Sequence, residues 1–284
     1  MNFKSLEQKC LHYRSLTDYS ILPNSNVIAM VDGRSFSKLV KKRFALPFDE
    51  DFVQMMNETA KYVCSKIQGC KIAYVQSDEI SFLITDYDTP DTDSFFGYRL
   101  CKMESIIASL ATAKFNQVFI NYLIEKEIAT RNDLPNEIDG RSDIVVVRDV
   151  LREMNLAQFD CKVWPVPSSN DAFAWFLYRQ IDCIRNSKQQ AAQTFLPHDV
   201  LKKHTTDVQI EMLKDQKGVD WHEYPDKYKF GRFVHQTTQH MSKEIKGEVH
   251  EFDRNVWVAM PGFQLTEEGG KERFYDLVPV LKLR

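Results

Sequence analysis

Two short acidic stretches contain the side chains whose types and spacing could carry out chemistry. Asp32-Gly33 directly follows the apolar run 26–31, and Ser77-Asp78-Glu79 lies between two runs rich in isoleucine, valine and aromatic residues. A carboxylate at the tip of a buried strand needs a partner, because an unpaired charge is costly once water is removed. Two carboxylates that lie close together repel each other unless a proton or a cation lies between them. These stretches therefore predict a cation site if the fold brings them together.

Mg²⁺ is the cation that this set of ligands favours, because it binds oxygen and is commonly held by one or two carboxylates plus phosphates. Its predicted ligands are Asp32, Asp78 and the carbonyl oxygen of Gly33. Two such ions can activate an attacking oxygen and stabilise a leaving one in nucleotidyl transfer. Glu79 either serves the second ion or forms a salt bridge. Each motif also has an ordinary explanation, since Asp-Gly after a strand is commonly a turn and an acidic hairpin tip is commonly solvated.

Groups that could bind a triphosphate follow the first carboxylate. The segment 33–37 offers backbone N–H groups and one cation, as an anion-binding turn does. Arg99 and Lys102 lie three residues apart in a predicted helix, so they share a face and could reach the same phosphates. The alternative for that pair is a solvated helix face. The candidates in the segment are Gly33, Arg34, Ser35, Phe36 and Ser37.

The elements that must position these residues follow from the spacing of apolar side chains. The pattern predicts strands over 26–31, 71–76, 79–85 and 158–166, and long helices over 50–67, 94–127 and 169–195. The order strand–helix–strand–strand–helix–strand is typical of an α+β fold with a four-stranded antiparallel sheet and two helices on one face. This is the ferredoxin-like arrangement of a polymerase palm.

The rest of the chain is predicted to be mostly helical. We expect a loop over 131–141, a short apolar stretch at 144–147, a helix near 199–213, and strands near 230–236 and 255–259. Residues 1–165 would form a palm-like catalytic domain, and residues 166–284 a helical C-terminal region packed on it as one structural unit.

Composition excludes several classes of protein. The chain has 284 residues, of which 43% are hydrophobic. The charges of its 37 basic and 40 acidic side chains nearly cancel, so only a local basic surface could bind nucleic acid. The absence of a long apolar run and of a signal peptide predicts a cytoplasmic protein without membrane contact. The six cysteines form no CxxC pair and the histidines have no HExxH spacing, which argues against zinc. No GxSxG, P-loop or GxGxxG motif is present.

Several longer stretches resemble a known family. The segments VDGRSF, PFDEDFVQMMNETA, AYVQSDEISFLI and KMESIIASLATAKFN are similar to the tRNA-His guanylyltransferase family. The likeness is strongest to its bacterial and phage-type members, the guanylyltransferase-like 3′–5′ RNA polymerases. FDCKVWPVPS, YRQIDCIRNS and DWHEYPDKYKFGRFV match as well, so the resemblance covers about residues 22–236.

The resemblance implies a palm-fold enzyme that extends the 5′ end of tRNA. ATP would adenylylate a 5′-monophosphate, and the 3′-OH of GTP or another NTP would then attack that end. Two Mg²⁺ ions would be held by Asp32, the Gly33 carbonyl and Asp78, with Glu79 beside them. The triphosphate would contact the backbone of 33–37 together with Ser77, Arg99 and Lys102. The family also implies a homotetramer.

Departures from the family pattern refine this expectation. Met30 stands where the family usually has arginine, Ser37 where eukaryotic members have histidine, and Leu46 where lysine is frequent. Residues 184–187 (IRNS) replace the His-Ile-Asn-Asn stretch tied to the tRNA-His role. These differences favour template-directed repair of 5′-truncated tRNA over addition of G to tRNA-His. A nucleotide cyclase-like palm enzyme and a catalytically weak tRNA-binding protein remain the alternatives.

Binding of tRNA requires a positive surface, and phosphate contacts make its affinity fall steeply with salt. For any one basic residue, the alternative is an ordinary surface charge. The principal candidates for tRNA contact are Arg185, Lys188, Lys202 and Lys203, with Lys41, Lys42, Arg43, Lys227, Lys229 and Arg232 as further ones.

Overall fold

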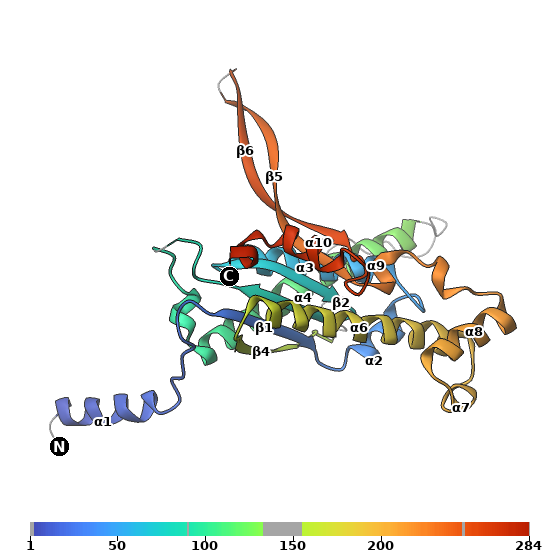
Figure 1. Ribbon diagram of the computed structural model, residues 1–284, viewed down its shortest axis with the longest axis horizontal. Helices are drawn as coiled ribbons and strands as arrows, with labels where there is room; N and C mark the ends of the chain where they lie inside the picture. The colour runs from blue at the N-terminus through green and yellow to red at the C-terminus, as the bar shows by residue number, and fades with distance from the viewer. Residues whose placement is uncertain (1–2, 90, 133–154, 246–247, 284) are drawn as a thin grey trace.

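Six strands form one antiparallel sheet in the computed structural model of the chain, which describes residues 3–89, 91–132, 155–245 and 248–283 (Figure 1). The strand order across the sheet is β4-β1-β3-β2-β5-β6. The apolar stretch predicted at 144–147 and most of the loop predicted at 131–141 lie outside the described residues. The strands are β1 (Asn26–Gly33), β2 (Cys70–Gln76), β3 (Glu79–Ile84), β4 (Phe159–Val166), β5 (Arg232–Ile245) and β6 (Glu248–Pro261).

The first four strands confirm the predicted α+β fold, because the order β4-β1-β3-β2 is the ferredoxin-like one. Strand β1 lies between β3 and β4, so Asp32 is directly opposite Glu79 on one side and Asp160 on the other. Strands β2 and β3 form the predicted hairpin, whose turn consists of Ser77 and Asp78. The ends of β1 and of this hairpin therefore meet at one edge of the sheet.

The long helices begin and end close to their predicted positions. Asp49 caps α3 by accepting a hydrogen bond from the Phe52 N–H, and Ser168 caps α6 by accepting one from the Asp171 N–H, as helix N-caps do. A 3₁₀ turn, Phe95–Tyr98, precedes α4, which starts later than predicted. The helices are α1 (Phe3–Ser15), α2 (Phe36–Arg43), α3 (Glu50–Lys66), α4 (Leu100–Asn132), α6 (Ser169–Phe195), α7 (His198–Leu201), α8 (Thr206–Lys217), α9 (Asp226–Lys229) and α10 (Gly270–Leu277).

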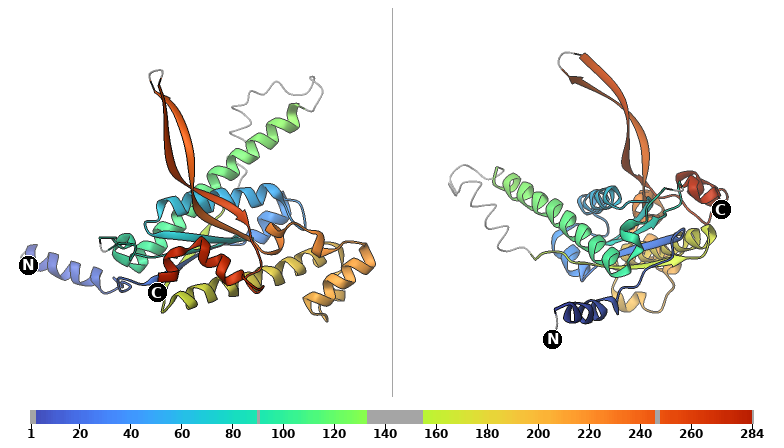
Figure 2. Two further views of the ribbon diagram at one scale, coloured as in Figure 1. Left: turned by 45° about the horizontal axis from the view of Figure 1, so that its top comes forward. Right: turned by 90° about the vertical axis from the view of Figure 1, so that its left-hand side faces the viewer.

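Helices cover both faces of the sheet (Figure 2). Alternate residues of β1 point to opposite faces. Val31 packs in the core that α3 and α4 form with the sheet, and Ile28 packs in the core that includes Phe176 of α6 and Phe274 of α10. The three-layer arrangement leaves the edge at Asp32 between the start of α3 and the middle of α6.

The second half of the chain contains more strand than its sequence predicts. Strands β5 and β6 are 14 residues each and form a hairpin that projects beyond the body of the molecule (Figure 1). Strand β5 pairs with β2, so one sheet contains strands from both sides of the boundary predicted at residue 165. The division into a catalytic domain and a C-terminal region at that residue stays a proposal. All six cysteines are free. Within the described ranges, no helix combines the length and apolar character that crossing a membrane requires.

Candidate active site

The two acidic stretches, 46 residues apart in sequence, lie together in one cavity. Asp32 at the end of β1 is directly opposite Glu79, and Asp78 is the preceding residue in the hairpin turn. All three line a cavity of about 600 Å³. Its walls come from the segment 45–53 on one side and from α6 on the other. The structure thus brings together the carboxylates that the sequence singles out.

The carboxylates in this cavity favour protonation or a cation. Burial raises the pKa of Asp78 to about 6, although a hydrogen bond of 2.8 Å from the Ser77 hydroxyl opposes the shift. Loss of solvent also raises the pKa of Asp32, and the charge of Asp160 on β4 raises it further. The positive charge of Arg179 acts in the opposite direction. The charge of Asp32 also raises the pKa of Asp78, and a divalent cation between the two carboxylates would remove this repulsion.

The donor set fits magnesium better than a soft metal. Across the residues that the structure describes, no three His, Cys, Asp or Glu side chains are grouped as a metal-binding cluster. Asp32 and Asp78 line the cavity, and the predicted third donor, the Gly33 carbonyl, belongs to the residue after Asp32. Mg²⁺ accepts such a set because substrate phosphates and water complete its coordination. Asp32, Asp78 and the Gly33 carbonyl therefore remain the candidate ligands.

Glu79 has a different role from its neighbour. Its two carboxylate oxygens accept hydrogen bonds from Arg179 of α6, at 2.8 Å from Nε and 2.5 Å from Nη2. Arg179 also reaches Asp182 at 3.0 Å, and Gln76 lies 3.3 Å from Glu79. Of the two roles that the sequence leaves open for Glu79, the structure shows the salt bridge. This ion pair joins the start of β3 to α6 in the wall of the cavity.

The segment 33–37 contributes backbone rather than side chains. Phe36 is 2% exposed and packs against Phe115 and Phe159 in the core, so its ring is not available to a ligand. A Cβ at Gly33 would lie 2.4 Å from the Phe36 ring, which explains why this position is glycine. Ser35 adopts φ 60°, and α2 begins at the next residue. The Arg34 N–H donates to the Gln158 carbonyl at 2.8 Å, so the N–H groups that follow it at the start of α2 are the ones that remain candidate phosphate donors.

Of the remaining predicted nucleotide contacts, only Ser77 lines the cavity of the carboxylates, and its hydroxyl donates to Asp78. Arg34 is exposed, its Nη1 lies 3.3 Å from Gln158 Oε1, and it lines a separate cavity of about 290 Å³. Ser37 is exposed in the first turn of α2. Ser77 lies beside Asp78 and lines the 600 Å³ cavity. Their predicted nucleotide contacts stay predictions.

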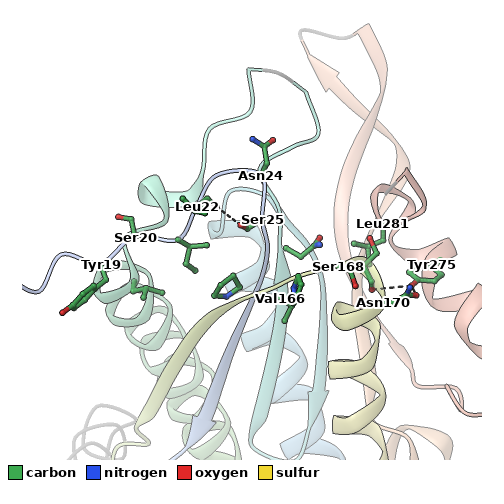
Figure 3. A pocket seen from close by; sticks show the side chains of 16 residues that line it. Tyr19, Ser20, Leu22, Asn24, Ser25, Val166, Ser168, Asn170, Tyr275 and Leu281 are labelled. Carbon is green, nitrogen blue, oxygen red and sulfur yellow. Dashed lines mark hydrogen bonds between the residues drawn. The ribbon is translucent and has the colours of Figure 1, made fainter.

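Arg99 and Lys102 lie at the opposite end of the sheet. Arg99 forms an isolated bridge with Ser20, and Lys102 lies 5.0 Å from the Phe96 ring centroid. The neighbouring Leu100 lines a second cavity, of about 1070 Å³, together with the start of β1 (Figure 3). Six steps along β1 separate Asn26 in that cavity from Asp32, a distance of about 20 Å. Within one chain, these two cations do not share a cavity with the carboxylates, and their role stays a prediction.

The basic residues proposed for tRNA contact are in different surroundings. Arg185 and Lys202 line one hollow of about 490 Å³, and each also pairs with an aspartate of its own helical segment. Lys188 pairs with Asp207 at 2.6 Å, and Lys203 is exposed. Their contact with tRNA stays a prediction.

Two further candidates do not belong to a positive surface. Lys229 is 9% exposed and Arg232 is 4% exposed, so the prediction that they lie on the surface is wrong. Lys229 is the last residue of α9 and Arg232 is the first residue of β5, and α9 packs against α6.

Two charged side chains that act on the carboxylates were not recognised in the sequence. Asp160 follows Phe159 in β4 and is opposite Asp32; strand alternation predicts its face, but its position beside Asp32 also depends on the register of β4 against β1. Arg179 could not be found in this way, because nothing local in the helical sequence pairs it with Glu79, 100 residues earlier.

Comparisons with known proteins agree with this geometry. The sequence profile of the tRNAHis guanylyltransferase family matches residues 8–167. A tRNA(His) guanylyltransferase of Neurospora crassa is 27% identical over 266 residues, which are 93% of this chain and 78% of that protein. Arabidopsis thaliana tRNA(His) guanylyltransferase 2 is 25% identical over 81% of this chain and 39% of its own length.

Solved structures extend the comparison. A bacterial tRNA(His) guanylyltransferase-like protein in complex with ATP is 28% identical and superposes with a TM-score of 0.72, over 96% of this chain and 97% of that one. The complex of such a bacterial protein with GTP gives a TM-score of 0.64 at 27% identity, over 96% and 99%. The Saccharomyces cerevisiae enzyme, 21% identical over 79% of this chain and 91% of its own, shares the fold with a TM-score of 0.58.

Proposed function

The chain belongs to the tRNAHis guanylyltransferase family, a family of nucleotidyltransferases, and from this premise we propose that it adds nucleotides to the 5′ end of tRNA in the 3′–5′ direction. The observation that carries the proposal is the meeting of Asp32 and Asp78 in one cavity. Related bacterial proteins have been solved with ATP and with GTP, which supports nucleoside triphosphates as substrates here.

We propose a reaction in two transfers. In the first, an oxygen of the tRNA 5′-monophosphate attacks the α-phosphorus of ATP and pyrophosphate leaves, which gives an adenylylated end. In the second, the 3′-OH of an incoming NTP attacks the 5′-phosphorus, a phosphodiester bond forms, AMP leaves, and the hydroxyl proton is released. Both transfers develop negative charge on phosphate oxygens, which a catalyst must stabilise.

The residues of the cavity have distinct tasks in this proposal. Asp32, Asp78 and the Gly33 carbonyl hold Mg²⁺, which when bound would neutralise phosphate charge and acidify the attacking hydroxyl. The N–H groups at the start of α2 donate to phosphate oxygens. Arg179 opposes the rise in the pKa of Glu79 that burial causes and holds its carboxylate in place, so that the turn carrying Asp78 stays fixed against α6. The wall formed by Phe48, Trp175 and Tyr178 excludes water from the nucleotide.

We further propose that the incoming nucleotide is chosen by pairing with the 3′ half of the acceptor stem. Met30 stands where the family usually has arginine, Leu46 where lysine is frequent, and Ser37 and the IRNS stretch at 184–187 where eukaryotic members have histidine and the His-Ile-Asn-Asn stretch tied to the tRNA-His role. Met30 lies beside Asp32 in the cavity and offers no hydrogen bond to a nucleotide. These departures support repair of truncated tRNA over addition of one fixed G.

The test is an extension assay. A tRNA that lacks its first nucleotide and carries a 5′-monophosphate is incubated with ATP, Mg²⁺ and each NTP in turn. Extension only by the NTP complementary to the opposing 3′ base is expected. Addition of G whatever the opposing base would instead give the tRNA-His activity. No adenylylated RNA at all, with tRNA bound, would indicate a binding protein, and a cyclic nucleotide formed without RNA would indicate a cyclase.

A further inference from the structure

The first helix, α1, has an apolar stripe that its own chain leaves uncovered. None of its 13 residues is buried, and the helix leads away from the body of the molecule (Figure 1, Figure 2). Four of its side chains recur at helical spacing and share one face: Phe3, Leu6, Cys10 and Tyr13. All four are exposed. A helix of about 12–15 residues is only marginally stable in water by itself, so α1 needs a surface that covers this stripe.

The chain that follows α1 fixes the direction of the helix. Residues 19–21 run beside the start of α4, where the Tyr19 carbonyl accepts a hydrogen bond of 2.9 Å from the Leu100 N–H. Only residues 16–18 separate α1 from this segment, and the Asp18 N–H already donates to the last residue of the helix at 3.1 Å. Turning α1 back over its own chain would break these contacts. A partner outside the chain can cover the stripe and leave them intact.

The large cavity at the start of β1 is a matching surface. It has a volume of about 1070 Å³, and none of the described residues that line it is charged (Figure 3). Tyr19 and Leu22 line it and are exposed, so the apolar part of its wall is open to a partner. This wall belongs to the segment 19–26, which directly follows α1. Each chain therefore carries both an uncovered apolar helix and an uncovered apolar cavity.

The charges near these two surfaces are opposite in sign. On α1, three cations accompany one anion: Lys4, Lys9, Arg14 and Glu7. The loop 86–93 carries four aspartates, three of them exposed. Asp86 accepts a hydrogen bond of 3.1 Å from the Asn24 N–H, which places this loop beside the cavity wall. On the other side of the cavity, the cation Lys271 donates to Asn170 at 2.9 Å. A basic helix thus complements the side of the cavity that the loop 86–93 adjoins.

We propose that α1 of one copy docks in the 1070 Å³ cavity of a second copy, which returns the same contact with its own α1. Such an exchange is closed, because one two-fold axis relates the two contacts. A helix of this length is about 20 Å long and about 10 Å wide. Two such contacts bury on the order of 1,500 Å², which is the size of a specific interface. The inference concerns the surface between copies and does not depend on the proposed function.

The native Cys10 in the stripe allows a direct test on the full chain. In a Cys101→Ser background, which removes the other exposed thiol, Ser25→Cys places a second thiol in the cavity wall. Ser65→Cys, at an exposed position of α3, is the matched control. Oxidised glutathione should give a disulfide-linked dimer on a non-reducing gel with Ser25→Cys, about tenfold more than with the control, because docking holds the two thiols together.

Two variants of α1 separate the stripe from the helix itself. Leu6→Asp puts a charge into the apolar contact and should reduce the linked dimer about tenfold. Leu11→Asp makes the same change about 140° around the helix, outside the stripe, and should leave the amount of linked dimer unchanged.

Equal linking with Ser25→Cys and Ser65→Cys would overturn the inference. A disulfide within one chain would overturn it too, and mass spectrometry of mixed ¹⁴N- and ¹⁵N-labelled protein distinguishes the two products. An equal loss in Leu6→Asp and Leu11→Asp would contradict the role of the stripe. Binding of the unaltered protein to anionic lipid vesicles, with no linked dimer formed by Ser25→Cys, would assign the stripe to a membrane surface instead. Should Leu6→Asp unfold, the comparison of Ser25→Cys with Ser65→Cys decides.

Discussion

The ion pair between Arg179 and Glu79 gives a quantitative prediction about how the active site is held. Its side chains are 12% and 10% exposed, and two hydrogen bonds of 2.8 and 2.5 Å join them. Removing one partner of a buried pair leaves an uncompensated charge and costs about 3–5 kcal/mol of folding free energy. Arg179 retains some contact with solvent, so we expect about 3 kcal/mol for Arg179→Met.

Replacing both members should cost much less than the two single changes combined. Arg179→Met leaves a charged Glu79 buried, and Glu79→Gln leaves a guanidinium whose remaining carboxylate partner is Asp182. In Arg179→Met/Glu79→Gln neither ion is stranded, so the double-mutant cycle should give a coupling of about 2 kcal/mol. A loss of 3 kcal/mol corresponds to a fall in Tm of roughly 6–12 °C.

Urea unfolding followed by tryptophan fluorescence measures these free energies, since Trp175 lies beside Arg179 and donates to Ser81. Lys202→Met, which breaks an exposed pair with Asp199, is the control and should change stability by less than about 1 kcal/mol. The reasoning would be refuted if the double variant lost as much unfolding free energy as the two single variants together, or if Arg179→Met lost less than about 1 kcal/mol. Glu79 would then be free to act on substrate instead.

Three further results are expected. Phe36→Ala should lower stability by about 3–5 kcal/mol in urea unfolding, because the ring is 2% exposed; a loss under about 1 kcal/mol would place Phe36 outside the core. Gly33→Ala should lower it by about 1–3 kcal/mol, because the new Cβ would lie 2.4 Å from the Phe36 ring, and the double variant Gly33→Ala/Phe36→Leu should recover part of this. The hydrogen bond from Lys227 lowers the pKa of Glu50 to about 2 in the folded protein. Ionised Glu50 therefore contributes fully to folding stability above its unfolded pKa near 4.5, and this contribution is lost as the pH falls toward 2. Glu50→Gln should thus be less stable than the unaltered protein by about 0.5 kcal/mol at pH 7, a gap that narrows on acidification; a gap that widens would contradict the assignment.

Local patterns in the sequence predict the elements and their order, because apolar spacing and helix caps act over a few residues. Asp49 and Ser168 cap the helices that they precede, and the β2–β3 hairpin forms around Ser77-Asp78. The ferredoxin-like order then brings Asp32 beside the hairpin. This part of the site depends only on which strands are neighbours, and that much follows from the sequence.

The rest depends on contacts between distant segments. The prediction that Arg99 and Lys102 share one helix is wrong for Arg99, which is the extended residue just before α4 and bridges to Ser20. The spacing also does not say at which end of the sheet that helix begins. Phe36 lies among polar residues in the sequence, and its burial depends on Phe115 and Phe159. Arg232 resembles a surface cation until β5 pairs with β2 and turns it toward Asn57. The partner of each of these residues, Ser20 for Arg99 included, lies 79 or more positions away in the sequence.

The most direct test of the central claim is the transfer of the labelled adenylyl group from [α-³²P]ATP to the 5′-monophosphate of a truncated tRNA, in Mg²⁺. Asp32→Asn and Asp78→Asn keep the shape of each side chain and remove its charge. Asp199→Asn, at a side chain that is 92% exposed, is the control. We predict label on the RNA with the unaltered protein and the control, and none with either carboxamide variant, at unchanged urea midpoints. Adenylylated RNA formed at the normal rate by folded Asp32→Asn or Asp78→Asn would contradict the account.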